Sequence, residues 1–280
     1  MADNITRTTI NLPSEVSSEI LQKTQEQSAV MQLARQVTLP GHGLTIPVIT
    51  ADPAAEWVAE GAKKPVSNST LGTKLMQAYK LAVIEVFSEE FTRDAQALYD
   101  ALIARLPLAL ANKFDATVIG GTAPGENFDS LAKATAQAIT ADTAYSALVA
   151  ADSDIATHNG VVNGFVLSPQ ARSVLLSAVD KDGRPLFINS VADGAIPMIL
   201  GSQALVSKAA YKAGTPNIAG VVGDWTQAMY GTVEGVKIDI SNQATVGDIN
   251  LWQQNMVAVR AEIELGFRAD TTVFNTLTIA

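Results

Sequence analysis

The longest helical pattern in the sequence runs from Ser88 to Gly121. Apolar residues recur there every three or four positions, which places them on one face of a helix; they are Phe91, Ala95, Leu98, Leu102, Leu106, Ala109, Leu110 and Phe114. Ser88 can cap the start, and Gly120 with Gly121 can end the helix. Pro107 lacks an amide hydrogen and should bend it near its middle. We predict one long, bent spine helix around which the other elements are arranged.

Before this helix, the alternation of hydrophobic and polar residues predicts a projecting β-hairpin. Its strands are expected in LTIPVIT and EWVAEG on one side and KLAVIEVF on the other, around the turn-rich stretch GAKKPVSNSTLG. Two strands alone are marginally stable, and the prolines at 47, 53 and 65 exclude them from the middle of a large sheet. Residues 1–37 hold only two short helical patches, SEVSSEILQK and SAVMQLARQ. We predict that they form an arm whose partner surface could belong to a neighbouring subunit.

The remaining residues predict a lobe of helices and strands followed by one long strand. Alanine-rich helices are expected at 129–139 and 143–157, a buried strand in GVVNGFVLS, and a helix opened by Ser168 and Pro169 and closed by KDGR. Further strands are expected in PMILGSQALVS, NIAGVVGDW and AMYGTVEGVKIDIS. In the last strand, one face is apolar (Val257, Val259, Ala261, Ile263, Leu265 and Phe267) and the other carries Arg260, Glu262, Glu264 and Arg268. Its apolar face should pack on the spine helix.

Composition narrows the classes of function. The chain has 280 residues, 48% of them hydrophobic and only 17% charged, so much uncharged surface is left for contacts with other chains. The net charge of −9 argues against a general phosphate-binding surface, because nucleic-acid affinity comes mostly from clustered Lys and Arg, and we expect no sequence-specific binding of nucleic acid. The absence of cysteine excludes disulfides and zinc–thiolate sites and suits a reducing cytoplasm. No apolar run reaches about 18 residues, so we expect no membrane span.

Five strings together resemble one protein family: AEWVAEGAKKPVSNSTLG, KLAVIEVFSEEFTRDA, VLSPQARSVLLSAVDKDGRPLF, VVGDWTQAMYG and MVAVRAEIELGFRADTTVF. In this order and spacing they resemble the major capsid proteins of tailed phages, which have the Hong Kong 97-like fold. The resemblance implies an α+β architecture with five parts. These are an N-terminal arm (1–37), an extended β-hairpin loop (38–87), a peripheral domain with the spine helix (88–130), an axial α+β domain (131–245) and a peripheral return strand (246–280).

The function implied by the resemblance is structural. Copies would form hexamers and pentamers of an icosahedral head shell around double-stranded DNA, without cofactor, metal or enzymatic activity. A projecting hairpin and a detached arm agree with this, because identical neighbours can cover them and heterologous contacts that close generate rings. The shell would assemble in the host cytoplasm with a separate scaffolding protein, since the family's scaffolding segment does not precede the arm here, and with portal and decoration proteins. An encapsulin-like shell around a cargo enzyme is the alternative, and what copurifies would distinguish the two.

Some members of this family link subunits covalently, and the matching positions here are Lys64, Asn255 and Glu262. The lysine amine would attack the asparagine amide while the glutamate accepts a proton, with the three groups supplied by different subunits. In the alternative interpretation, Lys64 is a solvated cation, Asn255 a strand-edge residue, and Glu262 the partner of Arg260 or Arg268. A single band at 29.4 kDa from boiled shells would exclude the bond.

Other chemistry has little support in the sequence. His42 and His158 lack a second ligand at metal-binding spacing, and DSDIATHNG has Asn163 where a calcium loop needs glutamate. A hydrolase could use Asp224 with a second carboxylate, and it would act as a monomer with a defined pocket. A glycan-binding module would need the tryptophans exposed together; we interpret Trp57, Trp225 and Trp252 as packing or interface anchors.

Overall fold

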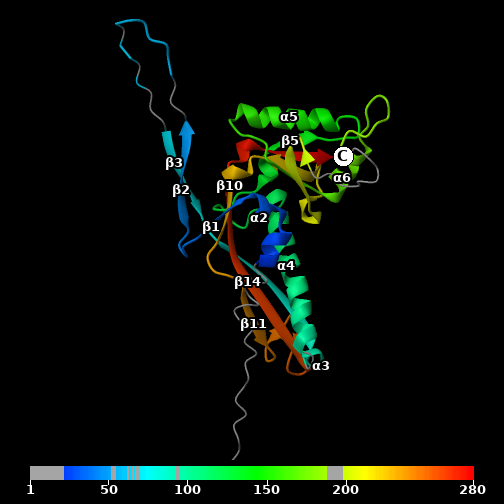
Figure 1. Cartoon of the computed structure of the whole chain (residues 1–280). Coiled ribbons are helices and arrows are strands. Elements are labelled where there is room, and N and C mark those ends of the chain that lie inside the picture. The colour runs from blue at the N-terminus through cyan, green and yellow to red at the C-terminus, as the bar shows by residue number, and fades with distance from the viewer. Residues whose placement is uncertain are drawn as a thin grey trace, which may run out of the picture.

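The computed structural model describes residues 22–51, 55–61, 63–64, 66, 70–92, 95–187 and 198–280, with the side chains at 49–51, 70–71 and 91–104 left out. Two β-sheets flank a long helix, and a hairpin projects from one of the sheets (Figure 1). No helix in these ranges is both long and apolar enough to cross a membrane.

The first sheet has five strands built around one long strand. They are β1 (Arg35–Thr38), β4 (Tyr79–Ser88), β10 (Ala228–Thr232), β11 (Lys237–Ser241) and β14 (Met256–Ala269). Leu265 of β14 pairs with Thr232 of β10 on one side and with Tyr79 of β4 on the other. Because β1 pairs with β10, the strands β1 and β4 lie at opposite edges of this sheet.

Strand β14 has the two faces that its alternation predicts. All six apolar residues from Val257 to Phe267 at alternate positions are buried, whereas Arg260 is exposed and Glu262 and Glu264 are partly exposed. The ring of Phe267 meets that of Phe114 in the spine helix edge to face, with centroids 6.3 Å apart. This confirms that the last strand packs on the spine helix.

The described helical residues of the spine are α3 (Glu89–Thr92) and α4 (Ala95–Ile119), and residues 93–94, on which the prediction of one continuous helix depends, lie outside the described residues. Ser88 pairs with Met256 in the β-ladder, so the backbone is still extended there. Helix α4 continues through Pro107 and ends before Gly120, as predicted. Leu106, Leu110 and Phe114 of the predicted stripe are buried, but Ala109 is exposed because it lies about 100° from Leu110 around the helix. The bend at Pro107 stays a prediction.

The projecting hairpin consists of β2 (Leu44–Ala51) and β3 (Thr70–Met76), paired antiparallel. The prediction that KLAVIEVF is its returning strand was wrong, because those residues belong to β4 in the first sheet. EWVAEG was also wrong as a strand, since residues 55–59 have no regular structure. The error over KLAVIEVF arises because alternation marks a strand but does not identify its partner.

The second sheet has the strand order β5-β15-β9-β6-β8-β7. The bounds are β5 (Thr135–Ala138), β15 (Phe274–Ile279), β9 (Asn217–Gly223), β6 (Gly164–Leu167), β8 (Ser202–Val206) and β7 (Met198–Ile199). Helix α5 (Ala144–Thr157) contacts β5, β9 and β15, and α6 (Pro169–Ser177) contacts β6 and β9. Ser168 caps α6 as predicted, accepting a hydrogen bond from the amide of Ala171.

The helix expected at 129–139 is wrong. Only the single turn η1 (Leu131–Lys133) forms there, and it is followed by β5. Strand β5 pairs in parallel with β15, so a long-range partner outweighs the helix propensity of the alanines.

Some strands pair with strands from a different expected domain, so the two sheets do not follow the domain boundaries expected from the sequence. Strands β10 and β11, expected in the axial domain, pair in the first sheet, and β15 returns to the second. The minor elements are η2 (Lys208–Ala210), η3 (Trp225–Gln227), η4 (Thr271–Val273), and the pair β12 (Thr245–Val246) with β13 (Ile249–Asn250).

Candidate functional site

The outer end of the hairpin carries apolar side chains without cover in the single chain. Trp57 is fully exposed and Val66 is 85% exposed, and Lys63 and Lys64 beside them are exposed as well. Figure 1 shows this part of the chain far from the two sheets. Since large exposed aromatic side chains are typical anchors of interfaces, this end is a candidate contact surface.

Arg268, near the end of β14, holds the base of the hairpin. Its Nη1 lies 2.7 Å from Oδ1 of Asp129, and its Nε and Nη2 donate to the carbonyl oxygen of Leu75 in β3 at 2.9 and 2.6 Å. Nη2 also donates to Oδ1 of Asn127 at 3.1 Å. With a side chain only 11% exposed, Arg268 fastens the hairpin to the loop after the spine helix.

Asp115 joins three elements in the middle of the molecule. Its carboxylate accepts hydrogen bonds from Ser28 Oγ at 2.5 Å, the Ala29 amide at 2.9 Å and the Val30 amide at 3.4 Å, all at the start of α2 (Ala29–Leu33). Ser207 Oγ, just before η2, donates at 3.4 Å. Burial raises the pKa of Asp115 to about 6, although these hydrogen bonds act in the opposite direction.

This joint corrects one expectation about the arm. The apolar residues of α2 are buried against the rest of the same chain, so this patch has its partner within the chain. Most of the first patch, SEVSSEILQK, lies outside the described residues. The sequence did contain a signal for the joint, since Asp115 stands among apolar residues in the second half of the spine helix.

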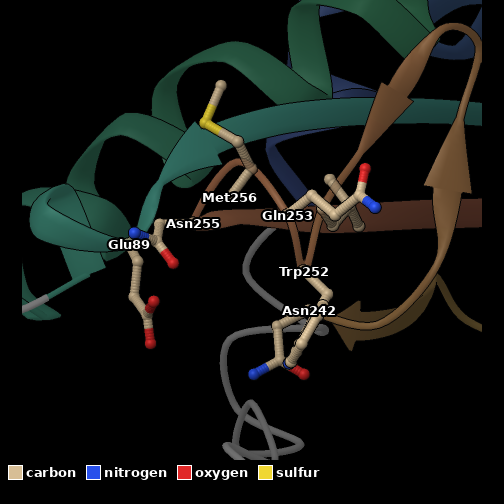
Figure 2. Close-up of a pocket in the computed structure, with 7 residues that line it drawn as sticks. Glu89, Asn242, Trp252, Gln253, Asn255 and Met256 are labelled. Carbon is tan, nitrogen blue, oxygen red and sulfur yellow. The ribbon is translucent and has the colours of Figure 1, made fainter.

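A cavity of about 540 Å³ lies at the start of β14, lined by Glu89, Asn242, Leu251, Trp252, Gln253, Asn255 and Met256 (Figure 2). The amide of Glu89 donates to the carbonyl oxygen of Asn255 at 2.8 Å, and Asn255 has a φ of 51°. Trp252 is 74% exposed and lies beside Asn242. The cavity therefore combines a carboxylate, amides and an exposed indole at one end of the first sheet.

The structure does not bring Lys64, Asn255 and Glu262 together in one chain. Lys64 lies in the projecting loop, whereas Asn255 precedes β14 and Glu262 lies seven positions further on, about 23 Å along the strand. Oε1 of Glu262 is 3.3 Å from Nε of Arg260, and its Oε2 is 3.4 Å from Nζ of Lys80. Arg268, the other expected partner of Glu262, pairs with Asp129 instead.

The sequence features nearest to a metal site are the two histidines and the stretch that resembles a calcium loop. His42 and His158 are both exposed, and the described ranges contain no group of three or more His, Cys, Asp or Glu residues that could hold a metal ion. Residues 152–157 of the calcium-loop candidate form the end of α5, so their backbone cannot wrap around an ion.

Asp224 has a structural role, which contradicts the hydrolase interpretation. Its carboxylate accepts hydrogen bonds from Asn163 Nδ2 at 2.9 Å, the Val161 amide at 3.2 Å and the amide and hydroxyl of Thr226 at 3.0 and 2.6 Å. Burial alone would raise its pKa, but these hydrogen bonds lower the pKa below the usual value. Asp224 therefore stays a charged cap of η3.

The three tryptophans do not form one binding site. Trp225 is buried, and its Nε1 donates to the carbonyl oxygen of Gly164 at 3.0 Å, which confirms it as a packing anchor. Trp57 belongs to the projecting loop, whereas Trp252 lies beside the start of β14. A glycan site built on clustered indoles is thus unsupported.

Comparison with known proteins gives one consistent result. The model of the phage capsid family matches residues 9–270. The probable major capsid protein gp17 of Mycobacterium phage D29 is 28% identical, over 95% of this chain and 89% of its own. The gp17 of Mycobacterium phage L5 is 29% identical, over 92% and 86%. A solved structure from Microbacterium phage Oxtober96 has a similar fold, with a TM-score of 0.75 at 21% identity over 91% of each chain.

Proposed function

This chain belongs to the phage capsid family, and we propose that it is the major capsid protein of a tailed phage. It self-assembles into the shell of the virion, which encloses double-stranded DNA. Hexamers and pentamers are the units we propose, because the hairpin offers a heterologous contact that closes into rings. The observation that carries this proposal is the hairpin itself, which is fastened at its base by Arg268 and bare at its outer end.

A cellular compartment shell is the second interpretation of the same fold. The relatives compared above favour the phage capsid, since both gp17 proteins are described as probable major capsid proteins. Shells purified from an infected host should contain DNA. Shells that contain a cargo enzyme and no DNA would overturn the phage interpretation.

Scaffolding, portal and decoration proteins complete the proposed assembly, which takes place in the host cytoplasm. These partners are supported by the resemblance of the whole chain to head proteins. No part of the proposal involves catalysis, in agreement with a family that is not a class of enzymes.

Assembly tests the proposal directly. The purified chain, with a scaffolding protein supplied where needed, should form closed particles visible by negative-stain microscopy and sedimentation. We expect Trp57→Ala to lower particle yield at least tenfold, because the exposed indole anchors a neighbour. Trp57→Phe should keep most of the yield.

The free energy of unfolding separates assembly from folding. Trp57 has no cover in the single chain, so the unassembled Ala variant should unfold at the same urea concentration as the native protein. A native protein that remains monomeric at high concentration, or an Ala variant that assembles normally, would contradict the assignment of this contact.

We further propose that the shell is held together without covalent bonds. Glu262 is already engaged with Arg260 and Lys80 on the polar face of the first sheet, so both of its carboxylate oxygens have partners within the chain. Boiled, denatured shells should therefore run as one band at 29.4 kDa. A ladder of larger bands that disappears in Lys64→Met would establish the bond and refute this proposal.

A further inference from the structure

Strand β4 leaves one edge of the first sheet open. Its ten residues, Tyr79–Ser88, pair with β14 on one side, and no strand in the described part of the chain pairs with the other side. An exposed edge of this length is a template for another strand, and natural proteins usually shorten, charge or cover such edges. Here the edge carries apolar side chains, including Ile84, which is 48% exposed.

The buried face of the sheet is also incomplete at this edge. Directly paired residues share a face, so Leu81 and Val83 lie on the same side as Ile263 and Ala261. The two β14 residues are at most 1% exposed, whereas the two β4 residues are only half-buried. An additional strand beside β4 would bury Leu81 and Val83 as fully as Ile263 and Ala261 are buried.

Two features at this edge fit an added strand. A cavity of about 250 Å³ lies where β4 meets α4; Leu81, Phe114 and Leu265 line it with apolar surface, and the exposed Lys113 lies at its rim. Oε2 of Glu85, on the same face of β4, is buried without a hydrogen-bond partner. An added strand could place an apolar side chain in the cavity and a cation beside Glu85.

We propose that residues 5–12 of a second copy of this chain pair with the open edge of β4. The segment reads ITRTTINL, in which Ile5, Thr6, Thr8, Thr9 and Ile10 are β-branched, and Pro13 ends it. Arg7 is its only charged residue, and it would face an edge that carries Glu85. This inference rests on the proposed function, because it names the part of the neighbour that covers this surface.

The described geometry favours a second copy over the same chain. The chain enters the first sheet at β1, at the edge opposite β4. Its preceding helix α2 is fixed by Asp115, which lies two positions after Lys113 and so about 200° around the spine helix from the rim of the cavity. The chain's own segment would have to wrap around the spine helix to reach β4.

The absence of cysteine from the sequence makes disulfide trapping specific. One population carries a single cysteine in the segment (Arg7→Cys, Thr8→Cys or Thr9→Cys), and the other carries Ala82→Cys or Ile84→Cys on the edge. After co-assembly and mild oxidation, at least one combination should give a dimer on non-reducing gels, at least tenfold more than Thr8→Cys with Thr157→Cys on α5. Thr8→Pro in a Thr9→Cys chain should lower that dimer at least tenfold, whereas Thr8→Val should not.

The outcomes separate this inference from the proposed function. Well-formed shells without a disulfide in any combination would overturn the inference and leave the function standing. A disulfide that forms only when both cysteines are in one chain would assign the edge to the chain's own segment and overturn the role of the second copy. If the unsubstituted chain forms no shells, the function and the inference fail together.

Discussion

Arg268→Ala should lower the free energy of unfolding of the unassembled protein by about 3 kcal/mol. The substitution removes the cation from Asp129 and leaves the carbonyl oxygen of Leu75 without its two donors. Because the arginine side chain is only 11% exposed and that of Asp129 20%, water can replace these bonds only in part. Urea denaturation, followed by tryptophan fluorescence and circular dichroism, measures the change.

Arg260→Ala is the matched control, because it removes the same residue type from the same strand. Its side chain is 46% exposed and pairs with Asp239, which is 60% exposed, so water can replace the lost contacts and the free energy of unfolding should change far less than in Arg268→Ala. Arg268→Lys keeps the charge but not the planar fork and should fall between the two. Equal effects of Arg268→Ala and Arg260→Ala would refute the role of Arg268 as the fastening of the hairpin.

Loss of this fastening should affect assembly more than folding. The contacts of Arg268 join β3 to the loop after the spine helix, and they fix the direction in which the hairpin leaves the sheet. A neighbour can bind the outer end of the hairpin only in one orientation of the hairpin. A hairpin that pivots freely must be ordered on binding, which adds an entropic cost at every contact of the shell. Arg268→Ala is therefore expected to abolish particles at temperatures where the chain is still folded.

The elements that could be predicted from the sequence are those with local causes. Alternation located β14 and both of its faces, and Ser168 with Pro169 located the start of α6, because each signal is contained in a few neighbouring residues. The errors concern partners: KLAVIEVF is a strand of the first sheet, and residues 135–138 form β5 because β15 lies beside them. Propensity is a weak prior where a strand from far along the chain supplies the hydrogen bonds.

The residues of the candidate site also differ in whether their roles follow from the local sequence or from partners far along the chain. Trp57 could be predicted as an interface anchor, because an indole within a loop that projects has nothing else to cover it. Arg268 and Asp115 could not be assigned roles, since their partners are 139 and about 86 positions away in the chain. Only the folded arrangement shows that Arg268 holds the hairpin and Asp115 holds α2 to the rest of the chain.

Asp115→Asn should remove a stabilisation that the native protein gains in mild acid. The pKa of Asp115 in the folded protein is about 6, above its usual value of 3.8, because burial disfavours the charged form. The folded state therefore binds this proton more tightly than the unfolded state, and the stability gained from protonation is present at low pH and is lost as the pH rises through about 6. Between pH 7 and pH 5 the native protein should gain about 1 kcal/mol relative to the Asn variant.

Ser28→Ala distinguishes this titration from a mere loss of contacts. It removes the hydrogen bond of 2.5 Å but keeps the buried carboxyl, so it should destabilise the protein by about 1 kcal/mol and retain the gain in acid. Urea denaturation of the three unassembled proteins at pH 7 and pH 5 measures both effects. If the native protein and Asp115→Asn change in parallel between these pH values, Asp115 does not take up a proton in this range. In that case α2 is held by a carboxylate that stays charged, and the attachment of the N-terminal segment does not depend on pH.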